Sequence, residues 1–329
     1  MPVARFGCDR FFVKAMSWPS SISELMQEST SLERNGDVAT ALQRAQEALT
    51  QARAGSEPNT IVIALLRVAS VRYRLGQFDA ARTLGEQALE LATPNSPAGA
   101  HALIALGVYA LETGSPAEAE QFLHHAADIG RENGDIRLRF MALVDLAAVY
   151  IPSGKFDLAF AADAEAYRLA SEHNLQEQVY LPLVHKAQTD WLMGQREQMR
   201  MTLDELRKTC SPGSVPEGYR SLLCACLVQD EGDMQTAAAL FTQARSVAET
   251  IGDPGLNCLL RIGLSRYHRA LSNAAKAYEW ANDAVALAER ADCRRMWGAR
   301  DDRACPRRVA EWQSRKRRSR FARRDPKPC

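Results

Sequence analysis

The sequence has no long hydrophobic run and few aromatic residues, which make up 7% of its 329 residues. No stretch approaches the roughly 18 consecutive apolar residues that a membrane-spanning helix needs. The N-terminal segment, residues 1–19, has three basic residues but no apolar core of the kind found in secretion signals, so we expect a cytoplasmic protein. Alanine is plentiful, and this composition favours packed helices over a β-rich fold.

Cysteine is also scarce, with eight residues in the chain and no pair at the CxxC spacing of metal and redox sites. We therefore expect reduced thiols, several of them buried as small apolar side chains. The closest pair in sequence, Cys224 and Cys226, would face different sides of a helix, which argues against a shared metal ion.

Signatures of the common enzyme classes are missing as well. The sequence has no GxxxxGK[ST] phosphate loop, no GxSxG nucleophile turn, no HExxH zinc motif and no GxGxxG dinucleotide motif. The adjacent His124 and His125 would point about 100° apart on a helix and are better interpreted as part of a solvated polar face than as metal ligands. We expect no enzyme activity, no metal and no other cofactor.

Charge is distributed unevenly along the chain. Residues 294–329 hold 14 Lys or Arg against 4 Asp or Glu, a charge of +10, whereas the whole chain has +1, which leaves −9 for residues 1–293. An acidic body is thus followed by a basic tail, and we place the boundary at residue 293. Ahead of the body, residues 1–21 are expected to form a flexible leader.

The basic tail has three interpretations. A disordered tail without a dedicated partner is the first. A nucleic-acid arm is the second, in which Arg315, Lys316, Arg317 and Arg318 would contact phosphates. The third is a frame-shifted end, since an Arg- and Pro-rich run without Leu or Ile is what out-of-frame reading of GC-rich DNA tends to produce. Of the three, we favour the frame-shifted end.

Small residues recur along the body with a fixed period, at spacings of 38 or 40 residues. They are Gly36, Gly76, Gly114, Gly154, Gly194, Gly232 and Ser272. Five and twelve residues after each of them stands alanine, except for Met199 and Leu206 in the fifth unit, and seven residues before each of them stands Ser, Ala or Gly. A period of this length marks a solenoid of stacked helix pairs, with a glycine turn inside each pair and small residues where helices approach closely.

Here the sequence resembles a known family. The segments LGQFDAA (75–81), QAL (87–89) and EGDMQTA (231–237) resemble the tetratricopeptide (TPR) motif, and the resemblance covers about residues 22–292. It implies an all-α, right-handed TPR-like α-solenoid of about seven helix-turn-helix repeats. The period near 39 exceeds the usual 34, and this long-repeat style is similar to the sensor arms of bacterial regulators such as the maltose-activator branch of the LuxR group.

TPR arrays line their concave face with the first helix of each pair. By this analogy, residues two, three and six positions before each turn point into the groove. The expected groove residues are Tyr73, Arg74, Val108, Leu111, Ile151, Gln188, Trp191, Gln229, Arg266 and Arg269. Tyr73, Leu111, Ile151 and Trp191 would be the anchors, although Leu111 and Ile151 could equally fill the core between helices.

The leading functional hypothesis is a non-catalytic scaffold that binds another protein or a peptide in this groove. A chaperone-type carboxylate clamp is not expected, because the position ten residues before each turn is apolar throughout. The alternatives are the sensor arm of a bacterial transcriptional or signalling regulator without its output domain, and nucleic-acid binding through the tail. No membrane partner is expected.

Overall fold

The computed structural model describes residues 20–34, 36–175 and 178–290. The predicted leader lies outside these residues except for Ser20 and Ser21, which begin the first helix, and the predicted tail at 293–329 lies outside them entirely. Within the described residues the chain forms fourteen α-helices and no strand. The predicted all-α class and the seven helix pairs are therefore confirmed.

The helices follow one another with short connections. They are α1 (Ser20–Arg34), α2 (Val38–Arg53), α3 (Pro58–Arg74), α4 (Phe78–Leu91), α5 (Pro97–Glu112), α6 (Pro116–Glu132), α7 (Ile136–Ser153), α8 (Phe156–Glu172), α9 (Tyr180–Met193), α10 (Arg196–Arg207), α11 (Val215–Glu231), α12 (Met234–Ile251), α13 (Pro254–Ala270) and α14 (Ala274–Arg290).

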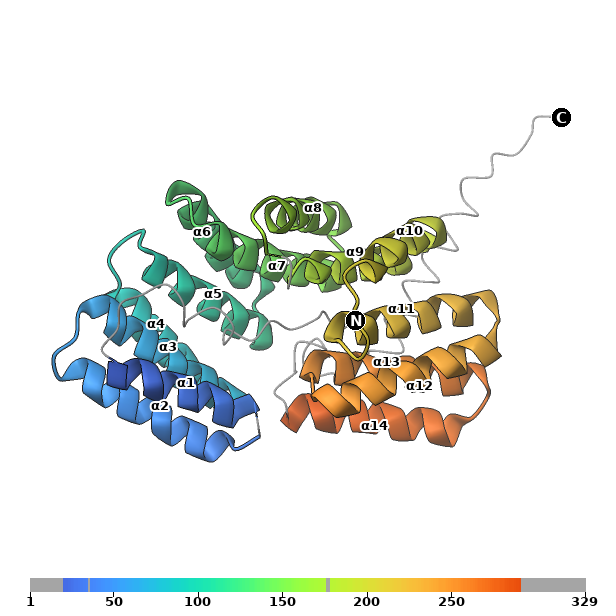
Figure 1. The fold of residues 1–329 in the computed structure, drawn as a ribbon, viewed down its shortest axis with the longest axis horizontal. Helices are drawn as coiled ribbons and strands as arrows, with labels where there is room; N and C mark the ends of the chain where they lie inside the picture. Colours follow the sequence, from blue (N-terminus) through green and yellow to red (C-terminus); the bar gives the residue numbers. More distant parts are fainter. Residues whose placement is uncertain (1–19, 35, 176–177, 291–329) are drawn as a thin grey trace.

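The pairs stack side by side and curve into an open arc (Figure 1). Each odd-numbered helix contacts the next odd-numbered helix, from α1–α3 through to α11–α13. The even-numbered helices lie outside them, as α6, α8 and α10 do at the top of Figure 1. The inner face of the arc is therefore built from the first helix of each pair, as expected from the TPR resemblance.

The turn inside each pair has the left-handed backbone that the glycine period predicts. The angle φ at the seven turn positions lies between 58° at Ser272 and 95° at Gly232. A Cβ atom at Gly76 would meet no other atom within 4 Å, so the glycine there is required by backbone conformation and not by space.

The columns of small residues lie where helices touch. The residues five and twelve positions after the turn are fully buried in the second pair, where Ala81 and Ala88 are both 0% exposed. Seven residues before the turn, a Cβ atom at Gly107 would lie only 2.7 Å from Leu123 Cγ. In the first pair the Ser29 hydroxyl donates to the Ala41 carbonyl at 2.8 Å, which links two of the columns directly. Close helix approach is thus the reason for the small residues.

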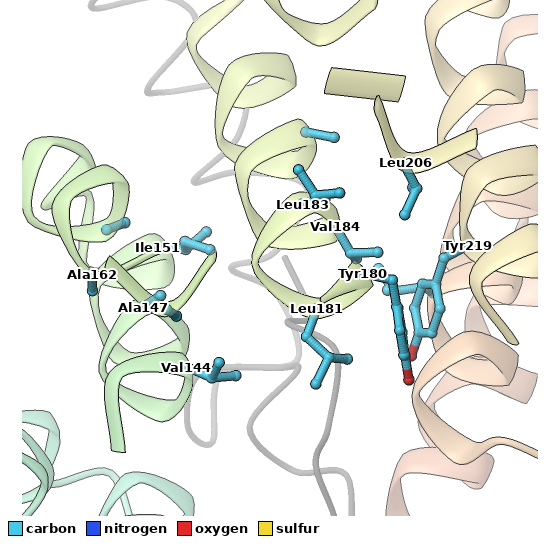
Figure 2. Close-up of a cluster of buried hydrophobic side chains, with 14 of the residues drawn as sticks. Val144, Ala147, Ile151, Ala162, Tyr180, Leu181, Leu183, Val184, Leu206 and Tyr219 are labelled. Carbon is cyan, nitrogen blue, oxygen red and sulfur yellow. The ribbon is translucent and has the colours of Figure 1, made fainter. Parts of the chain in front are cut away.

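The fifth pair keeps this packing with larger side chains. Met199 and Leu206, which replace alanine in the two columns, are both 0% exposed, and α10 is the shortest described helix, with 12 residues. Figure 2 shows Leu206 close to the rings of Tyr180 and Tyr219 in the core that joins α9, α10 and α11. The centroids of these two rings lie 6.4 Å apart, within the range of an aromatic pair, so the rings add to the packing between α9 and α11.

Aspartate side chains cap the first turn of two inner helices, α7 and α13. The Asp135 side chain accepts a hydrogen bond from the Leu138 amide at 3.0 Å, and Asp253 accepts one from the Leu256 amide at 2.7 Å. Each cap satisfies a free backbone donor at the start of an inner helix and so fixes where that helix begins.

Candidate functional site

The predicted groove residues all lie on inner helices, but they differ in exposure. Tyr73 and Val108 are 7% exposed, Ile151 2% and Gln188 1%. Arg74, Leu111, Trp191, Gln229 and Arg266 are half-buried, and Arg269 is exposed. Fewer of the predicted groove residues are therefore accessible than the sequence analysis expected. Of the four expected anchors, only Leu111 and Trp191 are partly exposed.

The N-terminal part of the inner face is closed by packing and ion pairs. The Tyr73 ring packs against Phe78 and Tyr109, with centroids 5.7 and 5.1 Å away. Arg74 lies 2.9 Å from the buried Glu33 carboxylate, which also accepts a 2.6 Å hydrogen bond from the buried Arg67. Tyr73 and Arg74 thus hold the first three repeats together, a role that the spacing rule does not distinguish from ligand contact.

The middle of the inner face is apolar. Ile151 belongs to the buried cluster of Figure 2, together with Val144 and Ala147 of the same helix. Leu111 packs against this core and is only partly covered by it. Ile151 therefore fills the space between helices, which is the second of the two roles considered for it.

The C-terminal half of the inner face contains a pocket. Its walls come from three successive inner helices, α9, α11 and α13, and most of them are apolar. The lining residues are Gln188, Trp191, Leu222, Leu223, Cys226, Leu259, Ile262, Gly263 and Arg266. Burial raises the pKa of the Cys226 thiol to about 12, so this thiol is uncharged at neutral pH and contributes an apolar surface.

A polar cluster holds the rim of this pocket. Trp191 Nε1 donates to Asp230 Oδ2 at 2.7 Å, and the Arg266 guanidinium carbon lies 4.1 Å from the centroid of the Trp191 ring. Arg266 Nη2 is 3.7 Å from Asp230 Oδ1, and Arg196 donates to the Asp230 backbone carbonyl at 3.1 Å. Three consecutive repeats thus fix one aromatic face and one cation beside the pocket.

Gln188 has an unusual environment at the same pocket. Its side-chain amide is buried, and neither Nε2 nor Oε1 has a hydrogen-bond partner among the described residues. An amide without partners in an apolar site costs free energy. Gln188 is therefore a predicted groove residue whose polar atoms could gain hydrogen bonds from a ligand.

Buried ionisable groups form a second cluster, which the sequence analysis did not find. Asp163 of α8 and His185 of α9 are both buried, with Oδ1 and Nδ1 3.2 Å apart. Asp190, on the same helix as His185, accepts a hydrogen bond from Lys186 of α9 at 2.8 Å and one from Thr202 of α10 at 3.1 Å. Burial raises the pKa of Asp163 to about 6, against an opposing effect of His185. In the sequence, the cluster is marked only by Asp163, a charged residue within the alanine-rich segment 156–172.

The remaining candidate ligands are dispersed. Among the described residues no three His, Cys, Asp or Glu side chains are grouped as a metal site would require. His124 Nε2 lies 2.7 Å from the Tyr150 hydroxyl, so that histidine has a side-chain partner in addition to its solvent contact. None of the described helices combines the length and the apolar character that a membrane crossing requires.

Comparison with known proteins agrees with the repeat architecture. Residues 60–132 match the family model of the tetratricopeptide repeat, so the predicted repeat type is confirmed over that stretch. No curated protein matches the chain.

Several solved structures share the fold. A Rap protein complexed with competence and sporulation factor has a TM-score of 0.66 at 13% identity, over 85% of this chain and 78% of that one. The apo form of RapI gives 0.64 at 11%, over 83% and 99%. The Rap conjugation gene regulator of plasmid pLS20, in complex with the Phr* peptide, gives 0.61 at 13%, over 88% and 81%. At these identities the similarity establishes the fold alone.

Proposed function

We propose that this tetratricopeptide-type array is a non-catalytic scaffold that binds a peptide segment of another protein on its inner face. The binding region is the C-terminal half of that face, where Trp191, Gln229 and Arg266 are half-buried and Arg269 is exposed. The middle of that face contributes the half-buried Leu111 as an apolar contact.

The observation that carries this proposal is the arrangement of Trp191, Asp230 and Arg266 on three consecutive inner helices. A half-buried tryptophan beside a cation is the type of surface that provides most of the binding energy in protein recognition. The indole N–H is already bonded to Asp230, so the ring is held in place before a partner arrives, and less entropy is lost on binding. Two of the structures with this fold were solved with a bound factor or peptide, which supports a peptide as the partner.

The test is a selection of phage-displayed random dodecapeptides on the full chain, followed by titration of the enriched peptides by fluorescence anisotropy. Trp191→Ala should weaken binding at least tenfold, because an aromatic anchor is lost. Met201→Ala on the outer helix α10 is the matched control, since Met201 is 72% exposed, and it should bind as the parent does.

Circular dichroism of both variants checks that the array stays folded. If no peptide is enriched, or if Trp191→Ala binds as tightly as Met201→Ala, the proposal is wrong. Tyr73→Ala is unsuitable as a groove variant because Tyr73 is buried in the core. The sensor-arm hypothesis would add an output domain to this binding role. The nucleic-acid hypothesis rests on Arg315, Lys316, Arg317 and Arg318, which lie outside the described residues.

A further inference from the structure

The pocket between α9, α11 and α13 has a chemical character that restricts what the inner face can bind. We infer that it holds one small apolar side chain of the bound peptide, that Gln188 bonds to the peptide backbone beside this side chain, and that Arg266 pairs with a neighbouring carboxylate. This inference rests on the proposed function and specifies its ligand.

The size of the pocket sets the first restriction. Its volume is about 20 Å³, and about 10–15 Å³ is the least that a cavity needs to hold one water molecule. The space is therefore filled by a methyl group. Leu222, Leu223 and Leu259 form apolar walls that favour such a group over a polar one. An alanine side chain fits this description, whereas a leucine side chain is too large.

The Gln188 amide sets the second restriction. It is 1% exposed and has no hydrogen-bond partner among the described residues. A primary amide offers both donors and an acceptor. Because both amide atoms are buried in the free protein, the Gln188 side chain has to rotate toward the pocket for its amide to reach the carbonyl and the N–H of a peptide backbone. Binding of a peptide residue would therefore satisfy atoms that are unsatisfied in the free protein, whereas an apolar ligand would leave them so.

Arg266 sets the third restriction. Its guanidinium carbon lies 4.1 Å from the centroid of the Trp191 ring, and Nη2 is 3.7 Å from Asp230 Oδ1, so most of its five N–H donors are not used by described residues. Asp230 is itself engaged by Trp191 Nε1. The exposed Arg269 lies on the same helix one turn away. A carboxylate on the peptide therefore complements the positive charge at the rim.

The test uses the peptides enriched in the selection described above. Their sequences should share an alanine-sized residue next to Asp, Glu or the C-terminal carboxylate. Replacing the small residue by Leu should weaken binding at least tenfold, because the pocket cannot hold the larger side chain. Amidation of the peptide C-terminus and Asp→Asn or Glu→Gln replacements show which carboxylate pairs with Arg266.

Gln188→Met gives the sharpest result, because the inference predicts opposite effects on stability and on binding. Removing an unsatisfied buried amide should raise the melting temperature of the free protein, while losing its bond to the peptide should weaken binding about tenfold. A purely structural role for Gln188 would leave peptide affinity unchanged.

Ser221→Ala is the matched control for Gln188→Met. Ser221 of α11 is also fully buried, with a hydroxyl that has no partner among the described residues, but it does not line the pocket. This variant should raise the melting temperature without affecting affinity. Cys226→Met fills the pocket from α11 and should weaken binding of the same peptides.

The outcomes separate the two proposals. If peptides are enriched and lose affinity with Trp191→Ala, but bind Gln188→Met and Cys226→Met as tightly as the parent, the inference about the pocket is wrong and the proposed function stands. If no peptide is enriched, both are wrong.

Discussion

At the scale of single residues, the array buries ionisable groups whose protonation changes on folding. Burial lowers the pKa of His101 to about 4, and it raises the pKa of Asp163 to about 6. The folded state therefore binds fewer protons at His101 and more at Asp163 than the unfolded chain does. Between about pH 4 and pH 6 the two groups act on stability in opposite directions, so their effects partly cancel in the parent protein.

Replacing Asp163 by Asn should separate these effects. The raised pKa of Asp163 means that its carboxyl favours folding below its unfolded pKa of 3.8 and loses this contribution as pH rises through about 6. An asparagine side chain does not ionise, so the variant avoids the cost of a buried carboxylate. Its free energy of unfolding above pH 6 should exceed that of the parent by up to about 3 kcal/mol. His101 then remains, and the free energy of unfolding of the variant should rise with pH between about 4 and 6.5.

Urea denaturation from pH 4 to pH 8 measures this difference between the parent and Asp163→Asn. A difference that stays constant over the whole pH range would contradict the prediction. The unfolding transition should be followed with two spectroscopic probes, because repeat arrays can depart from two-state behaviour and coincident transitions test for it.

At the scale of elements, the helix pair is the unit that could be predicted in most detail. The glycine period located all seven turns, and the small columns located the helix contacts, because both depend on backbone geometry within one repeat. The exposure of the groove residues could not be predicted in this way. It depends on how closely neighbouring inner helices approach, and thus on packing between repeats, as the buried Ile151 and the half-buried Trp191 show.

The turns give a prediction with two opposite outcomes. Ser272 adopts φ of 58°, a conformation that glycine adopts at lower cost, so Ser272→Gly should stabilise the protein by about 1 kcal/mol. Gly76 adopts φ of 75° with free space around it, so Gly76→Ala should destabilise it by about 1 kcal/mol through backbone strain alone. Thermal denaturation of the two variants beside the parent measures both changes. Shifts of the same sign would show that the turn conformation does not control stability.

At the scale of the whole molecule, each described repeat makes its most extensive contacts with its neighbours along the arc. Such arrays behave approximately as a chain of coupled units, in which a local defect propagates to adjacent repeats and no further. The sequence predicted this organisation from its period. It did not predict the asymmetry of the inner face, where ion pairs close the N-terminal half and a pocket opens the C-terminal half.

Overpacking one joint should therefore have a local effect. Ala159 is fully buried between α7 and α8, and Ala159→Leu should destabilise this joint by about 1–3 kcal/mol. Hydrogen exchange followed by mass spectrometry should show faster exchange in α7, α8 and α9, with α1 and α2 unchanged. Uniformly faster exchange from α1 to α14 would indicate a single cooperative unit instead.

The shared left-handed turn also has an evolutionary consequence. The seven turns have one backbone conformation, and most of the repeats have the same columns of small residues. An in-frame duplication of the DNA between two successive turns would therefore encode a repeat that packs on its neighbours through interfaces like the existing ones. Duplication or loss of a repeat therefore changes the length of the arc without requiring a new kind of interface. The number of repeats can therefore change by one at a time under selection. The three helices that line the pocket in the last repeats would stay adjacent to one another.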